Sequence, residues 1–198
     1  MSELMLDASS TAVVVIDLQK GIVATPVAPH SADSVVKNCI SLVNAARAAG
    51  AHVVIVHVGR SADGADGLRP VADETMRMPG ALPPDWSDLL PDLGRQPADT
   101  VILKRQWGAF YGTDLDLQLR RRGLKTMILC GISTEFGVES TARDAYERGY
   151  EQVFAEDAMT GRTAESHATA VTRIFPRMGR IRSTGEIVAA LGAKGGSA

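Results

Sequence analysis

The sequence predicts an α/β fold: a doubly wound, Rossmann-like, mainly parallel sheet of about six strands, with helices on both faces in three layers. Two observations carry this prediction. Short apolar runs rich in β-branched residues recur along the chain, which is typical of strands buried on both faces of a parallel sheet. Stretches with helical spacing of apolar residues separate these runs, and such an alternation builds crossover connections onto one sheet.

The first part of the chain supplies a strand, a helix and a second strand. Residues 11–16 (TAVVVI) form an unbroken, mostly β-branched run, as expected for a central strand. Apolar residues recur at helical spacing from Ser34 to Ala48, and Gly50 is a natural stop for that helix. Residues 52–56 (HVVIV) form the second predicted strand.

The second part of the chain continues the same alternation. The apolar runs predict strands at residues 100–103, 126–130, 152–155 and 179–182. The helical spacing predicts helices at residues 115–122, 138–148, 163–174 and 186–191. Each predicted strand except that at residues 52–56 therefore leads into a helix, which keeps the sheet parallel.

A Pro-rich connection, residues 60–98, interrupts this rhythm and contains six prolines. Connections of this length are usually functional, so we expect a lid over the site or a contact between subunits. No periodic apolar pattern fills the segment. The chain, residues 1–198, is therefore predicted to form one domain, a length that suits one hydrophobic core.

The composition is that of an ordinary globular chain, with 45% hydrophobic residues, 22% charged residues and a formal net charge of -2. Nothing in this charge favours nucleic acid or a membrane surface as a partner. The sequence shows no signal-peptide layout and no apolar run of about 18 residues, so we expect a cytoplasmic protein. Cys39 and Cys130 lie within apolar patterns and are predicted to be buried, inert thiols.

Three residues are predicted to meet at the carboxyl edge of the sheet, where parallel α/β folds bind ligands. Asp17 follows the first strand, Lys104 follows residues 100–103, and Gly137 begins the helix after residues 126–130. Considered separately, Asp17 is most simply interpreted as a residue that caps a loop, and Lys104 is most simply interpreted as a solvated charge. Their convergence predicts a site. Many hydrolases place a nucleophile at such a strand-to-helix turn, but glycine has no nucleophilic side chain.

At these positions the chain resembles the isochorismatase-like hydrolases, also called the cysteine hydrolase superfamily. The resemblance rests on residues 13–19 (VVVIDLQ), 104–115 (KRQWGAFYGTDL) and 130–143 (CGISTEFGVESTAR), which follow one another in the family's order. It is greatest with a bacterial subgroup that carries the last two motifs. The resemblance implies a hydrolase that acts on a small polar organic molecule and assembles as a homo-oligomer.

In family members with amidase activity, an Asp, a Lys and a Cys form the catalytic triad, which corresponds to Asp17, Lys104 and Gly137 here. Isochorismatases of the family also lack the Cys and cleave a vinyl ether with an acid and a water molecule. The resemblance thus implies hydrolysis by an Asp/Lys pair without a covalent intermediate. Two alternatives stay open: amide hydrolysis by direct water attack, and an inactive ligand-binding or regulatory protein on the hydrolase scaffold.

The chain also departs from the family's better-known patterns. Isochorismatases place a Gln after the second strand and an aromatic residue after the glycine that follows the fourth, where this chain has Val58-Gly59-Arg60 and Ile132-Ser133. We therefore expect a substrate other than isochorismate. The Asp-x-His plus His pattern of the metal-binding nicotinamidases is missing, so neither a metal nor another cofactor is expected.

The turn after the fourth strand is expected to help bind the substrate. Backbone N–H groups of Ile132, Ser133 and Thr134 would meet developing negative charge, together with the helix that begins at Gly137. The family resemblance also implies a cis peptide bond between Ile132 and Ser133. Glu135 has two interpretations: a carboxylate supplied to the empty nucleophile position, or a solvated charge favoured by the helix dipole.

Three aromatic residues follow Lys104: Trp107, Phe110 and Tyr111. They would either line a pocket for a small planar substrate or pack the loop that carries them. Among the histidines, His57 ends the second strand, whereas His30 and His167 lie far away in sequence. The sequence assigns none of these histidines to the site.

Overall fold

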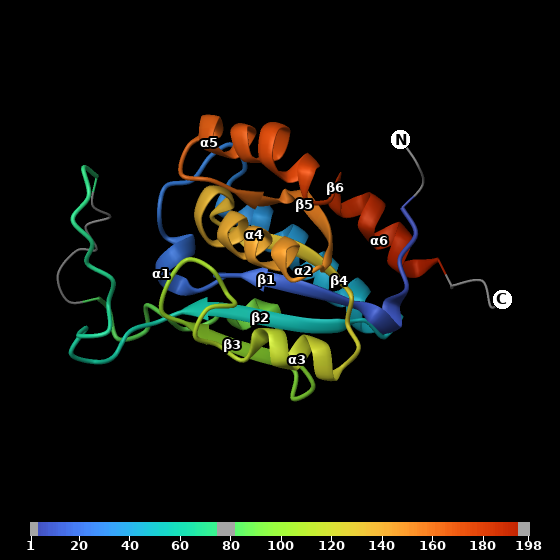
Figure 1. The fold of residues 1–198 in the computed structure, drawn as a ribbon, viewed down its shortest axis with the longest axis horizontal. Helices are drawn as coiled ribbons and strands as arrows, with labels where there is room; N and C mark the ends of the chain where they lie inside the picture. The colour runs from blue at the N-terminus through green and yellow to red at the C-terminus, as the bar shows by residue number, and fades with distance from the viewer. Residues whose placement is uncertain (1–3, 75–81, 194–198) are drawn as a thin grey trace.

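The computed structural model describes residues 4–74 and 82–193, and its centre is a sheet of six parallel strands in the order β3-β2-β1-β4-β5-β6 (Figure 1). The strands are β1 (Thr11–Ile16), β2 (His52–Val58), β3 (Thr100–Lys104), β4 (Thr126–Ile132), β5 (Glu151–Thr160) and β6 (Arg180–Arg182). The strand order reverses between β1 and β4. Ligands of doubly wound sheets bind beside such a reversal, at the carboxyl ends of the strands.

Helices cover both faces of the sheet, which confirms the predicted three-layer α/β fold. The helices are α1 (Lys20–Val23), α2 (Ala32–Ala49), α3 (Leu115–Arg121), α4 (Glu139–Glu147), α5 (Ala164–Thr169) and α6 (Thr184–Gly192). Shorter turns are η1 (Ala8–Ser10), η2 (Pro91–Leu93), η3 (Thr134–Val138), η4 (Ala170–Ile174) and η5 (Phe175–Arg177). Within the described ranges, no helix has the length and apolar character needed to cross a membrane.

The burial of strand β1 on both faces explains why its sequence is apolar without interruption. All six of its residues are buried, and they alternate between two cores. Val13 and Val15 pack with α2 and α6 on one face, whereas Val14 and Ile16 pack with α3, α4 and the η4–η5 segment on the other. A strand covered on both faces cannot show the apolar–polar alternation of a half-exposed strand.

Strand β5 is longer than the predicted strand at residues 152–155. Its register with β4 shifts between Leu129 and Gly131, and the strand then continues to Thr160. The pair Glu156-Asp157 resembles a strand end in the sequence, but the side chains of both residues find partners from other elements. Asp157 accepts hydrogen bonds from the backbone N–H and the hydroxyl of Thr184, at 2.6 and 2.7 Å. Polar residues within a buried strand are tolerated when they are paired in this way.

The two helices nearest the carboxyl edge also differ from their predicted forms. The helix predicted at residues 138–148 is α4, and the π-helical turn η3 precedes it. The helix predicted at residues 163–174 consists of α5 followed by the π-helical turn η4. Apolar spacing does not distinguish an α-turn from a π-turn, because both place similar residues on the core face.

The described part of the long connection between β2 and β3 extends away from the body of the protein (Figure 1). Its base is fixed near α1: the buried Gln19 side chain accepts from the backbone N–H of Val58 and donates to the carbonyls of Val58 and Trp86. Trp86 also covers Gly21 so closely that a Cβ there would lie 1.9 Å from its ring. A function for this segment as a lid or subunit contact stays a prediction.

Candidate active site

Asp17 and Lys104 form a buried ion pair at the carboxyl edge of the sheet. The Lys104 Nζ lies 2.8 Å from the Asp17 Oδ2, and the two side chains are 1% and 8% exposed, respectively. Lys104 also donates a hydrogen bond of 2.5 Å to the carbonyl of Trp107. Side chains from the ends of β1 and β3 thus meet across the intervening strand β2, as their sequence positions indicated.

The backbone fixes the position of Asp17. Its φ of 52° lies in the left-handed region, which Asp tolerates better than most residues. Its N–H donates to the carbonyl of Val56 at 2.9 Å, and its carbonyl accepts from the N–H of Gln19 at 2.9 Å. The chain therefore turns sharply at Asp17 while still paired with β2, which holds its carboxyl group at the strand end.

Gly137 lies directly against this ion pair. A Cβ atom at Gly137 would be 3.1 Å from the Asp17 Oδ2, 3.2 Å from the Lys104 Nζ and 2.8 Å from the Ile16 Cγ2. The structure therefore brings the three predicted residues, from the ends of β1, β3 and β4, to one point. It adds a neighbour that sequence reasoning did not include, since the Ile16 methyl group occupies part of the space that a side chain at position 137 would need.

We expect Gly137→Ala to lower the free energy of unfolding by about 1–3 kcal/mol, the usual cost of overpacking a core. Ile16 is completely buried and β-branched, so its methyl group cannot rotate away freely. Urea unfolding measures the change. Gly185→Ala in α6 is the matched control, because a Cβ there meets nothing within 4 Å. Equal stability of Gly137→Ala and the wild type would show that the site has room for a side chain.

Burial dominates the ionisation of Asp17. It raises the pKa of this carboxyl group, whereas the Lys104 ammonium and His57 act in the opposite direction without reversing the increase. The Oδ1 atom is buried and has no hydrogen-bond partner among the described residues. A buried carboxyl group with a raised pKa and a free oxygen is suited to exchange a proton with a bound molecule.

The turn after β4 carries the expected cis peptide bond between Ile132 and Ser133. The Ser133 carbonyl accepts from the N–H groups of Phe136 and Val138, at 3.3 and 3.1 Å, which starts the turn η3. The first N–H groups of a helix have no preceding turn to bind, so this turn presents donors near Gly137. The Thr134 side chain has another partner: its Oγ1 lies 2.9 Å from the His167 Nδ1.

The three aromatic residues after Lys104 do not form one wall. Trp107 packs on Phe136, with ring centroids 4.8 Å apart, and remains 53% exposed. Phe110 is buried in the core against Tyr150, and Tyr111 is 77% exposed. Only the Trp107 side chain therefore approaches the Gly137 turn, through Phe136. Phe136 was not among the predicted site residues, and its one signal in the sequence is its position next to Gly137.

Glu135 is directed towards the loop after β5. Its Oε1 accepts from the backbone N–H of Arg162 at 2.7 Å, and its Oε2 is buried. A Cβ at Gly161 would lie 2.7 Å from that second oxygen. The interpretation of Glu135 as a solvated charge was therefore wrong, because its carboxylate is packed against the neighbouring loop. No contact joins it to Asp17 or Lys104 in the described structure.

Both cysteines are buried and unpaired, as predicted. Cys39 donates to the carbonyl of Ala158 at 3.3 Å, and Cys130 lies 3.8 Å from the carbonyl of Val14. Burial raises the pKa of the Cys39 thiol well above its usual value. Both side chains belong to the core beneath α2, whereas Ile16 beside Gly137 belongs to the opposite core.

A second group of polar side chains gathers at the same edge. His30, Glu156 and His167 each offer one ligand atom, and these atoms lie within 4.8 Å of one another. The expectation that no metal binds rested on a missing Asp-x-His pattern, and this group has a different spacing. This group has no signal in the sequence, because 126 residues separate His30 from Glu156.

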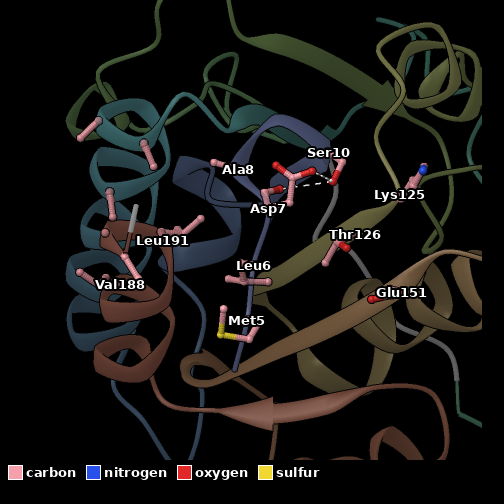
Figure 2. A pocket seen from close by; sticks show the side chains of 15 residues that line it. Met5, Leu6, Asp7, Ala8, Ser10, Lys125, Thr126, Glu151, Val188 and Leu191 are labelled. Atoms are coloured by element: carbon pink, nitrogen blue, oxygen red, sulfur yellow. Dashed lines mark hydrogen bonds between the residues drawn. The ribbon is translucent and has the colours of Figure 1, made fainter. Parts of the chain in front are cut away.

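A wide hollow of about 1060 Å³ lies elsewhere (Figure 2). Its walls include Leu6 and Asp7 of the N-terminal segment, Leu191 of α6, and Thr126 and Glu151 at the starts of β4 and β5. These are the amino ends of the strands, whereas Asp17, Lys104 and Gly137 lie at the carboxyl ends. The hollow is therefore distinct from the candidate active site.

A parallel α/β sheet with a buried Asp–Lys pair at its carboxyl edge, facing a strand-to-helix turn, is the arrangement that the sequence resemblance implied for an isochorismatase-like protein. Residues 11–186 match the isochorismatase domain family. The chain therefore belongs to the isochorismatase family, whose members are hydrolases.

Individual relatives agree with this assignment. The chain is 50% identical to the uncharacterised isochorismatase family protein YecD of Escherichia coli O157:H7 over 188 residues, which cover 95% of this chain and 100% of YecD. It is 32% identical to the ureidoacrylate amidohydrolase RutB of Methylorubrum extorquens over 77% of this chain and 70% of RutB. The structure of an isochorismatase family protein from Burkholderia thailandensis superposes with a TM-score of 0.91 at 44% identity, covering 97% of this chain and 100% of that one.

Proposed function

We propose that this protein hydrolyses a small polar organic molecule without a cysteine nucleophile, using Asp17 and Lys104. One observation carries the proposal: the buried Asp17–Lys104 pair faces Gly137, where a side chain would touch both charged groups. In the proposed assignment, Gly137 occupies the position of the nucleophilic Cys in related amidases. Without sulfur or oxygen at that position, no acyl-enzyme can form there, and water must attack the substrate directly.

Asp17 is the proposed proton donor or acceptor. Burial raises the pKa of this carboxyl group, which favours its protonated form, and that form can protonate a carbon or a leaving group. The ionised form accepts a proton from the attacking water. Lys104 holds the carboxyl group in place and stabilises negative charge that develops on the substrate. Backbone N–H groups of the Ile132–Thr134 turn would supply further stabilisation.

A second candidate reaction is amide hydrolysis by water attack, with Asp17 as the base. The similarity to a protein named as an amidohydrolase favours it. Here the water adds to the amide carbon, Asp17 takes the proton of the water, and the same proton passes to the departing nitrogen. The remaining alternative is a protein that binds its ligand at this site without turnover.

Turnover should survive the loss of both cysteines. Wild type and Cys39→Ala/Cys130→Ala are assayed against a panel of vinyl ethers, including isochorismate, and of linear amides and ureido acids. We expect hydrolysis of at least one compound by both proteins, since neither thiol faces the Asp17–Lys104 pair. Loss of turnover in the folded cysteine-free variant would contradict the mechanism. Binding across the panel without turnover by the wild type would support the ligand-binding alternative.

The protein is proposed to assemble as a homo-oligomer, with the connection between β2 and β3 contributing to the contact. Val71 and Leu68 in this segment are fully and 67% exposed, respectively, so their side chains are available for a contact between subunits. Light scattering at micromolar concentration should give a multiple of the 21.0 kDa chain mass. Leu68→Glu should shift the mass towards that of one chain, and Leu117→Glu on the exposed side of α3 is the control. A wild-type mass near that of one chain would contradict the proposal.

A further inference from the structure

Two histidines and a carboxylate converge at the carboxyl end of the sheet from three separate segments. His30 lies before α2, Glu156 lies in β5, and His167 lies in α5. The Glu156 Oε1 is 3.2 Å from the His30 Nε2 and 3.6 Å from the His167 Nε2. The two imidazole rings meet edge to face, with their centroids 5.5 Å apart.

The His167 side chain has an unusual hydrogen-bonding pattern. It is 3% exposed, and its Nδ1 lies 2.9 Å from the hydroxyl of Thr134. Its Nε2 is buried and has no hydrogen-bond partner in the described structure, although it points at the Glu156 carboxylate. The Thr134 hydroxyl can donate to or accept from the His167 Nδ1, depending on the tautomer of His167. In the tautomer whose Nδ1–H donates to Thr134, the Nε2 lone pair faces the Glu156 carboxylate, and a cation between these two acceptors would pair with both.

We propose that His30, Glu156 and His167 bind a divalent transition-metal ion, with Zn²⁺ as the best fit. Two neutral imidazoles and one carboxylate are a donor set that Zn²⁺ accepts, with a fourth position for water. Ligand atoms of a tetrahedral Zn²⁺ site lie about 3.3–3.6 Å apart, given metal–ligand bonds of about 2.0–2.2 Å. The two separations from the Glu156 Oε1, 3.2 and 3.6 Å, already bracket that value.

The surroundings hold the ligands in place. Thr134 fixes the orientation of the His167 ring, as the outer partners of metal-binding histidines commonly do. Thr160 donates to the carbonyl of His30 at 2.9 Å, and Ala28 pairs with Gly161 in an antiparallel bridge. A bound ion would thus join the segment before α2, strand β5 and helix α5. Through Thr134 it would also brace the turn that carries Gly137.

Zinc titration of the chelator-treated full chain tests the proposal. Calorimetry with ZnCl₂, together with metal analysis after dialysis, should give one Zn²⁺ per chain. We expect Glu156→Gln, which preserves shape, and His167→Ala to weaken binding by at least about 100-fold, and Thr134→Val to weaken it by about 10–100-fold. His52→Gln is the matched control, because His52 binds Thr100 at the other side of the sheet.

Two further measurements make the result independent of turnover. Co²⁺ in place of Zn²⁺ should give the visible absorption of a four-coordinate ion in the wild type and in His52→Gln. Zn²⁺ should raise the midpoint of thermal unfolding of the wild type and leave that of Glu156→Gln unchanged. Absence of Zn²⁺ binding by the wild type, or equal binding by wild type, His167→Ala and Glu156→Gln with native circular dichroism, would overturn the proposal. Absence of Zn²⁺ binding by the wild type would indicate that a proton shared between the imidazoles and the Glu156 carboxylate holds these side chains together.

Discussion

Asp17→Asn is expected to lower turnover by about 10²–10⁴-fold, the usual contribution of a positioned acid or base. The substitution preserves the shape of the side chain and removes the titrating group. Asp17 is buried, and no carboxyl group among the described residues is hydrogen-bonded to its Oδ1. The loss should appear mainly in kcat, since a proton-transferring group acts in the transition state.

The measurement uses a substrate from the panel above and compares Asp17→Asn with Asp33→Asn, an exposed carboxylate at the start of α2. Asp33→Asn should retain wild-type turnover. Circular dichroism and urea unfolding confirm that Asp17→Asn is folded under the assay conditions. Full activity of the folded Asp17→Asn protein would remove Asp17 from the mechanism and favour a site elsewhere on the chain.

Lys104→Met is expected to lower the free energy of unfolding by about 3–5 kcal/mol near neutral pH, because it leaves a buried carboxylate without its counter-charge. Lys104 is among the largest fully buried side chains of the described residues, and its Nζ contacts both Asp17 and the carbonyl of Trp107. Met fills similar volume without replacing either interaction. Urea unfolding at several pH values measures the loss.

The pH dependence of this loss has a definite sign. Burial raises the folded-state pKa of Asp17 above its ordinary value of 3.8, and removing Lys104 takes away the main opposing cause. Between the unfolded and folded pKa values, the native state keeps a proton that the unfolded state has released. Stability therefore falls as pH rises through this window, so Lys104→Met should be more stable at about pH 5 than at about pH 8.

The double variant Asp17→Asn/Lys104→Met provides the control, because it removes both charges. It should be more stable at neutral pH than Lys104→Met alone and nearly independent of pH in the same window. A loss in Lys104→Met that does not change with pH would contradict the proposed role of Asp17 ionisation. It would indicate instead that Lys104 stabilises the protein through the Trp107 carbonyl and its packed side chain.

The sequence alone determined the fold class and the three residues that meet at the candidate site. Unbroken runs such as residues 11–16 can be satisfied only by strands covered on both faces, which requires a layered parallel sheet. In such a sheet, residues just after the strands share one edge. The positions of Asp17, Lys104 and Gly137 in the chain therefore sufficed to predict that they meet.

The tertiary structure alone decided the side-chain partners that come from other distant segments. Strand β5 continues past Glu156-Asp157, because Thr184 pairs with the Asp157 carboxylate and His30 pairs with the Glu156 carboxylate. In the structure, Phe110 packs against Tyr150 in the core, and the Glu135 carboxylate accepts a hydrogen bond from Arg162 in the loop after β5. The tertiary structure also set the Ile16 methyl group beside Gly137 and assembled His30, Glu156 and His167. Local periodicity reports which face of an element is buried, whereas side-chain partners depend on how the elements pack.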